Sequence, residues 1–144
     1  YYSSWHYAAI HVILSIPGYD NAKKIASYYG MDQNQVQDIL DFLTSTGLVR
    51  EIEGRYEIGE TRIHLGKQSI QIRRHHTNWR NRAINSIDTN SPESLHYSSV
   101  LTISKKDVKK LKIILNKALD ECKEIIRESP EEEVQVFNID LFKL

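Results

Sequence analysis

The sequence predicts an α+β fold that is mainly helical, and three observations lead to this class. Apolar residues recur at spacings of three and four over most of the chain, which is the period of amphipathic helices. One short stretch, LVREIEGRYEIG (residues 48–59), has the pattern of two strands joined by a glycine-containing turn. Beyond residue 94 the pattern changes, because two alternating segments flank one long helical segment.

The first third of the chain predicts three helices. The first covers residues 3–16 and ends at Pro17-Gly18, and the second begins near residue 21 and ends at Gly30. Asp32 is expected to cap the third helix, which Gly47 ends. A tight turn between the last two helices, followed by a hairpin, is the order of a winged-helix-like helix-turn-helix module. We assign this module to residues 1–64.

The rest of the chain predicts a connecting helix and a second module. Residues 65–87 carry apolar positions amid many polar ones, and residues 88–94 read as a linker, so 65–94 is a basic connecting region. Residues 95–104 and 131–144 alternate as half-buried strands do, and Ser104 is expected to cap a helix of about 23 residues between them. Residues 95–144 therefore predict a strand-helix-strand module.

Composition limits the classes of function. The 144 residues include 19 basic and 19 acidic side chains, so the molecule has no overall charge with which to hold a polyanion. The single cysteine, Cys122, excludes an internal disulfide and fits a reducing cytosol. No apolar run is long enough to span a bilayer, and no signal-peptide pattern opens the chain. We expect a cytoplasmic protein without membrane contact.

The third predicted helix has an unusual charge for a DNA-reading element. It carries Asp32, Asp38 and Asp41 without any lysine or arginine, although phosphate contacts dominate affinity for DNA. Its candidate base-reading residues are Gln33, Gln35 and Gln37. The alternative, which we favour, is that this helix-turn-helix serves as a scaffold or as a partner-binding surface.

Basic residues gather instead on the connecting helix. They form a candidate surface for nucleic acid or another anion, which consists of Lys67, Arg73, Arg74, His76, Arg80 and Arg82. The alternative is a solvated face whose arginines pair with the acidic hairpin, since charge runs on surfaces usually do no more.

The sequence does not assemble a catalytic or metal site, so we expect a non-enzyme without a cofactor. His75 and His76 are adjacent and point about 100° apart on a helix, which does not suit one metal ion. Cys122 falls on the apolar stripe of its helix, and no glycine loop cradles a phosphate. Aromatic side chains near the start are expected mainly to pack between helices. Trp5, Tyr28 and Tyr29 are nevertheless candidates for lining a groove.

Five segments together resemble a known family. They are YYSSWHYAAIHVILSIPGY, IASYYGMDQNQVQDILDFLTSTGLV, SIQIRRHHTNWRNRAINSID, YSSVLTISKKDVKKLKIILNKALDECKEII and VQVFNIDLFKL. In this order and spacing they resemble a family of bacterial proteins classed as transcriptional regulators. The resemblance implies that this region is a C-terminal domain of unknown function, which follows a lambda-repressor-like helix-turn-helix domain absent from this sequence.

The leading function is therefore the effector or dimerisation region of a bacterial transcriptional regulator, whose DNA is bound mainly through the upstream domain. Direct DNA contact through the winged helix and the basic helix is one alternative, and a protein-interaction adaptor is another. The strands predicted in residues 95–144 leave open edges, which predicts a homodimer through this module. An unknown effector or protein partner also fits.

Overall fold

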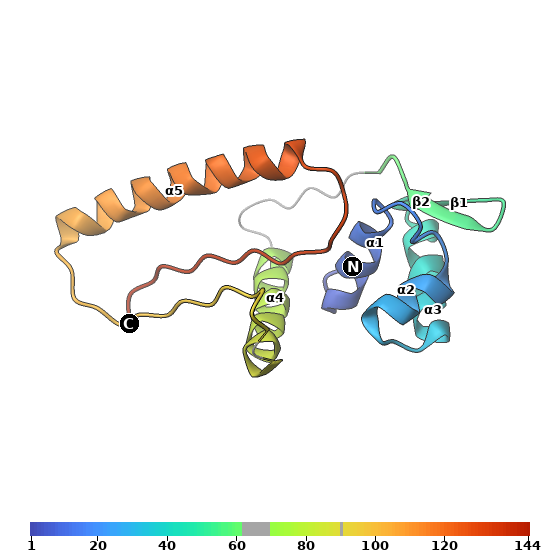
Figure 1. Cartoon of the computed structure of the whole chain (residues 1–144), viewed down its shortest axis with the longest axis horizontal. Helices are drawn as coiled ribbons and strands as arrows, with labels where there is room; N and C mark the ends of the chain where they lie inside the picture. Colours follow the sequence, from blue (N-terminus) through green and yellow to red (C-terminus); the bar gives the residue numbers. More distant parts are fainter. Residues whose placement is uncertain (62–69, 90) are drawn as a thin grey trace. The chain divides into compact units, whose positions relative to one another are not determined.

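The computed structural model describes residues 1–61, 70–89 and 91–144. The chain forms two compact units, one from residues 1–91 with 131–144 and the other from residues 92–130. The expected fold class, α+β and mainly helical, is confirmed, because the described residues form five helices and one two-stranded antiparallel sheet (Figure 1). Each unit is described by itself below.

Three short helices open the first unit: α1 (Trp5–Ile13), α2 (Ala22–Tyr29) and α3 (Gln33–Ser45). A polar side chain caps each N-terminus, because the first backbone N–H groups of a helix have no partner within it. Ser4 caps α1, Asn21 caps α2, and the Asp32 carboxylate accepts from the N–H groups of Asn34 and Gln35. The predicted cap of α3 is thus confirmed.

The predicted hairpin follows α3. Strands β1 (Val49–Ile52) and β2 (Arg55–Ile58) pair antiparallel, with Val49 opposite Ile58 and Ile52 opposite Arg55. Glu53 and Gly54 form the turn with φ angles of 52° and 76°. Two successive left-handed residues are typical of the two-residue turn whose twist matches that of paired strands.

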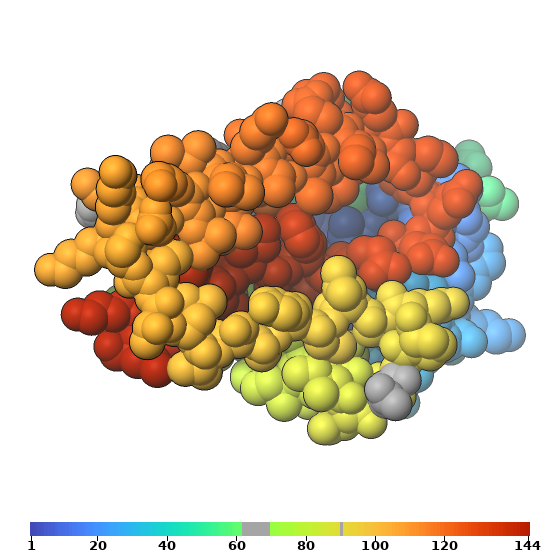
Figure 2. Space-filling model, turned by 60° about the vertical axis from the view of Figure 1, so that its left-hand side comes forward, coloured from blue at the N-terminus to red at the C-terminus, as the bar shows by residue number. Residues whose placement is uncertain are grey.

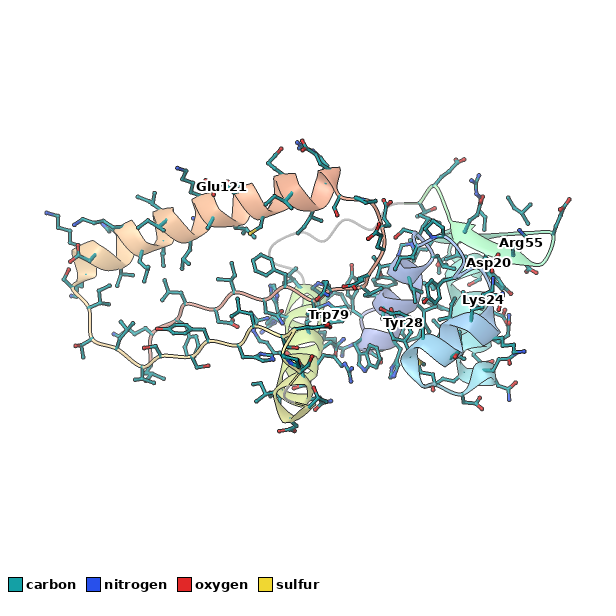
Figure 3. The ribbon with its side chains drawn as sticks, viewed as in Figure 1. Asp20, Lys24, Tyr28, Arg55, Trp79 and Glu121 are labelled. Atoms are coloured by element: carbon teal, nitrogen blue, oxygen red, sulfur yellow. The ribbon has the colours of Figure 1, made fainter. Side chains whose placement is uncertain are left out.

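Asp20 attaches the hairpin to the helices. Its backbone carbonyl accepts from the Tyr56 N–H at 2.8 Å. Its carboxylate binds Lys24 on α2 at 2.8 Å and Arg55 on β2 at 3.8 Å, and all three side chains are labelled in Figure 3. The loop between α1 and α2 therefore fixes the position of β2.

The hydrophobic core lies among α1, α2, α3 and the hairpin. Its fully enclosed side chains come from all three helices and from β1, and they are Ile10, Ile13, Ile25, Val36, Leu40, Leu43 and Val49. These are the positions at spacings of three and four that define the inner face of each helix. The three helices and the hairpin therefore form one packed module.

A longer helix, α4 (Ile70–Thr89), and the segment 131–144 complete the first unit. No side chain of α4 is buried among its described residues. The helix is held at its polar positions, where Asn78 donates to the Tyr2 carbonyl at 3.1 Å and Asn138 donates to the Trp79 carbonyl at 3.4 Å. Val134 packs against the core described above.

The second unit is built on one long helix, α5 (Lys105–Glu128). Ser104 caps it as predicted, because its hydroxyl accepts from the Asp107 N–H at 3.1 Å. None of the 24 residues of α5 is buried.

The two strands predicted beside α5 were wrong. Residues 95–104 and 131–144 are fully described, and neither segment forms a strand. Their alternating apolar residues remain largely open to solvent, as Tyr97 is 86% and Phe137 is 54% exposed. A strand requires a neighbouring backbone to satisfy its N–H and C=O groups, and the chain provides no such ladder for these two segments.

Candidate functional site

The outer surface of α3 is acidic, and one of its three candidate glutamines is already engaged. Gln37 donates from Nε2 to the Asp41 carboxylate and to the Tyr56 hydroxyl, both at 2.7 Å. Gln33 and Gln35 are exposed in the first turn, beside the capping carboxylate of Asp32. The glutamines therefore do not form one set of side chains that is free to meet a base edge.

The hairpin adds little positive charge to this surface. Arg50 binds Glu57 at 2.9 Å and Glu60 at 3.2 Å, and Arg55 lies 3.8 Å from Asp20. Exposed pairs of this kind contribute little stability, but they neutralise the two arginines that a phosphate would need. Glu51 and Glu53 remain exposed on the same hairpin.

The basic side chains of α4 do not form one stripe. Arg80 and Arg82 are two residues apart, so they point to opposite sides of the helix. Arg80 donates from Nε to the Asp140 carboxylate at 2.8 Å, and a second contact from its Nη2 joins the same oxygen. The Arg82 guanidinium lies over the Trp5 ring, 4.3 Å from the ring centroid. The expected alternative, pairing of these arginines with the hairpin, was wrong for Arg80, whose partner is in the C-terminal segment.

The remaining basic candidates lie near the start of α4. Arg73, Arg74 and His76 are exposed. No ion pair joins Arg73 or Arg74 to another described residue. Lys67 lies outside the described residues. The positive charge of α4 that no described carboxylate neutralises therefore belongs to Arg73 and Arg74 and, further along, to Arg82, which lies over the Trp5 ring.

The candidate groove aromatics pack against one another. Trp5 meets Tyr29 edge to face with ring centroids 6.0 Å apart, and Tyr28 meets Tyr29 in the same way at 4.9 Å. The Tyr29 hydroxyl donates to the Ala9 carbonyl at 2.9 Å, and burial raises the pKa of this phenol. Trp5 and Tyr29 therefore meet between α1 and α2, whereas Tyr28 is 42% exposed.

A shallow depression of about 550 Å³ lies elsewhere on the module. It is lined by the residues that follow α1 and by the hairpin, including Tyr19, Asp20, Arg55 and Tyr56. Trp5, Tyr28 and Tyr29 do not line it. Because Asp20 and Arg55 pair with each other there, the depression contains no converging set of free polar groups.

Side chains that could bind a metal ion are scattered over the described residues. No three His, Cys, Asp or Glu side chains among these residues lie together as a metal site would require. His75 and His76 are adjacent with ring centroids 6.1 Å apart, and Cys122 is a half-buried free thiol on α5. The same described residues include no helix that is both long and apolar enough to cross a bilayer.

Two features of the surface were not found from sequence. The pairing of Arg80 with Asp140 joins residues 60 positions apart, and no local pattern indicates it. The second is the extent to which α5 is uncovered: Ile114, Ile125 and Ile126 are 62%, 70% and 63% exposed. The apolar stripe of α5 was predicted, but a stripe by itself does not say whether the same chain covers it.

One comparison with known proteins identifies the family of this chain. The family model described as a domain of unknown function, DUF4423, matches residues 1–144. No curated protein and no solved structure was found to match the chain. Since the family match spans the whole sequence, the chain belongs to the DUF4423 family.

Proposed function

We propose that this chain is the interaction region of a bacterial transcriptional regulator, in which it binds a protein partner and leaves base reading to another domain. The resemblance of its five segments to that class of regulator supports the regulatory role. The order of α1, α2, α3 and the hairpin supports a winged-helix-like module. In this proposal the module is a scaffold.

The charge of the module supports the scaffold role. Asp32, Asp38 and Asp41 line the helix that would face the major groove, and both hairpin arginines are paired with carboxylates. Bringing these carboxylates to a phosphate backbone costs electrostatic energy, and no lysine or arginine on α3 offsets that cost. A surface of this charge is better suited to a protein partner than to DNA.

The observation that carries the proposal is the uncovered apolar surface of α5. A helix of 24 residues with a broad apolar stripe and no buried side chain exposes more apolar surface to water than the surface of a monomeric protein normally does. Such surfaces mark sites of association with proteins. A partner that covers the stripe gains about 25 cal/mol for each Å² of apolar surface removed from water.

The decisive experiment is a fluorescence-anisotropy titration of the chain against random duplex DNA at low and at physiological salt. We expect no binding at either salt concentration, up to about 100 µM protein, because non-specific DNA-binding proteins usually bind with dissociation constants of roughly 1–100 µM. Micromolar binding that weakens steeply with salt would contradict the scaffold role.

A direct DNA contact is the second candidate, and one observation favours it. Arg73 and Arg74 are exposed on α4 and form no ion pair with a described residue, so they are available to phosphates. If the chain binds DNA, replacing both with alanine should weaken binding and reduce the dependence on salt by about two phosphate contacts. Replacing Arg50 and Arg80 gives the matched control, since both guanidinium groups already pair with carboxylates.

A further inference from the structure

The apolar stripe of α5 is wide and continuous. It consists of Val108, Leu111, Ile114, Leu115, Ala118, Leu119, Cys122, Ile125 and Ile126. None of these side chains is buried, and in the space-filling view the side chains of α5 (orange) lie at the surface (Figure 2). Within the stripe, six residues follow one another at intervals of 3, 4, 3, 4 and 3, the spacing of a coiled-coil seam, from Val108 to Ile125.

That spacing reads the same in both directions. The midpoint of the series lies between Leu115 and Ala118, so Val108 and Ile125 are equally far from it, as are Leu111 and Cys122. A second α5 that runs in the opposite direction therefore presents the same series of apolar positions. This is the property that a two-fold interface requires, because the same patch must fit itself.

A row of charges borders the stripe on one edge and changes sign halfway along it. The row begins with Lys106, Lys110 and Lys117 and continues with Glu121, Glu124 and Glu128, at spacings that place all six on one side of the helix. Asp107 lies at the same edge in the lysine half, where it is bound by Lys110. Glu121, labelled in Figure 3, is seven residues from Ile114 and therefore lies beside the stripe.

Some charges of this row form ion pairs within α5, and others do not. Lys110 binds Asp107 at 2.7 Å, and Lys117 lies 3.8 Å from Glu121. Glu124 pairs with Arg127, and Lys106 forms no ion pair with a described residue. These pairs are exposed, so they can rearrange at little cost when a partner approaches.

The direction of the charge change distinguishes two ways of pairing. In a parallel pair the edge with this row would face the opposite edge of the second copy, which carries Lys105 and Lys112, so the row would not meet its own counterpart. Antiparallel helices bring each lysine half beside a glutamate half, and they also set the two helix dipoles in opposite directions. Only the antiparallel arrangement makes both the apolar series and the charged row complementary.

We propose that the partner of α5 is a second copy of this chain, and that the two α5 helices pack antiparallel about a two-fold axis between Leu115 and Ala118. This inference rests on the proposed role of α5 as an interaction surface and names its occupant. A helix of 24 residues extends over about 36 Å, which is long enough for three layers of apolar contacts on each side of the axis.

The test is sedimentation velocity on the whole 144-residue chain from about 1 to 100 µM. We expect a concentration-dependent species with twice the 16.8 kDa mass of the chain. Two half-reversal variants follow, Lys106→Glu with Lys110→Glu, and Glu121→Lys with Glu128→Lys. Each should weaken the dimer by about tenfold or more, because attraction becomes repulsion on both sides of the axis.

Combining all four substitutions in one chain separates the two orientations. In an antiparallel pair the fourfold variant restores opposite charges, so its dissociation constant should return to within about threefold of the parent value. In a parallel pair the row would face Lys105 and Lys112 of the second copy, so the first half-reversal variant would strengthen the dimer, which would overturn the antiparallel arrangement. The control is Lys23→Glu with Lys143→Glu, which changes the net charge as the first variant does but lies outside α5.

The inference is overturned by a chain that stays monomeric at 100 µM, or by a dimer that does not respond to the half reversals. A helix content that is unchanged by circular dichroism shows that each variant is folded. Should a charge variant lose helix, Ile114→Ser with Ile125→Ser tests the same face and should abolish the dimer. If the chain is monomeric and does not bind DNA, only the assignment of a second copy as the partner of α5 is contradicted. If the chain binds DNA, the proposed function itself is contradicted.

Discussion

His11 connects the first helix to the hairpin through both of its ring nitrogens. Nε2 donates to the Leu48 carbonyl at 3.1 Å, so the neutral ring accepts at Nδ1 from the Tyr1 hydroxyl at 3.2 Å. The side chain is half-buried, and this burial lowers its pKa, although the bond to Leu48 acts in the opposite direction. The folded protein therefore favours the uncharged imidazole at this position.

The lowered pKa of His11 predicts that stability falls in acid. Below pH about 6.5 the unfolded chain binds a proton that the folded chain resists, so the free energy of unfolding should decrease as the pH falls. Urea unfolding between pH 8 and pH 5 measures this decrease. His11→Gln should reduce its slope without abolishing it, because burial also lowers the pKa of His6 and His75. A slope that is the same in His11→Gln as in the parent chain would contradict the assignment to His11.

Truncation of Leu40 tests the enclosed core. It is completely enclosed on the inner face of α3, so Leu40→Ala removes buried methyl groups and leaves a cavity. We expect the free energy of unfolding to fall by about 2–5 kcal/mol, measured by urea unfolding. The matched control is Leu95→Ala at a side chain that is 94% exposed, where the change should stay within about 0.5 kcal/mol.

At the scale of elements, the hairpin depends on the conformation of its turn. Gly54 has a φ of 76°, and a Cβ at this position would meet no atom within 4 Å. Gly54→Ala therefore introduces no clash, and its cost is the left-handed backbone alone, about 1–2 kcal/mol. Gly54→Asn should cost less, because asparagine tolerates this region. If thermal unfolding shows that the two variants are destabilised equally, the left-handed φ of residue 54 is not the cause of the loss in stability.

The helices and the hairpin could be predicted from sequence because their signals are local. Asp32 and Ser104 cap the helices that follow them, and Gly54 marks the turn, all within a few residues of the bonds they form. The strands predicted at 95–104 and 131–144 failed for the opposite reason. Alternation shows only that a segment can present one apolar face, whereas a strand also requires a second backbone that the segment itself does not specify.

The candidate surfaces were less predictable than the fold for a related reason. The sequence shows that α4 is rich in arginine. Which of these arginines can meet a ligand depends on the positions of Asp140 and Trp5, which contact Arg80 and Arg82. Gln37 is likewise engaged by Tyr56, which lies 19 residues further along the chain. Charge patterns therefore predict where polar groups gather, and tertiary contacts decide which of them can meet a ligand.

At the scale of the whole molecule, the two units differ in what stabilises them. The module of α1, α2, α3 and the hairpin has an enclosed core, with Ile10, Ile25 and Leu40 fully removed from solvent. Residues 92–130 include no buried side chain. An isolated helix gains little stability from propensity alone, so α5 should depend on association for most of its stability.

This difference predicts two thermal transitions, followed by circular dichroism at 222 nm. The transition of the core module should be independent of protein concentration. The transition of α5 should move to higher temperature as the concentration rises, because association stabilises only the folded helix. Leu40→Ala should lower the first transition and leave the second in place, whereas Ile114→Ser with Ile125→Ser should do the reverse. A single transition at a temperature independent of concentration would mean that α5 is stabilised within its own chain, and the stripe would then need no partner to remain folded.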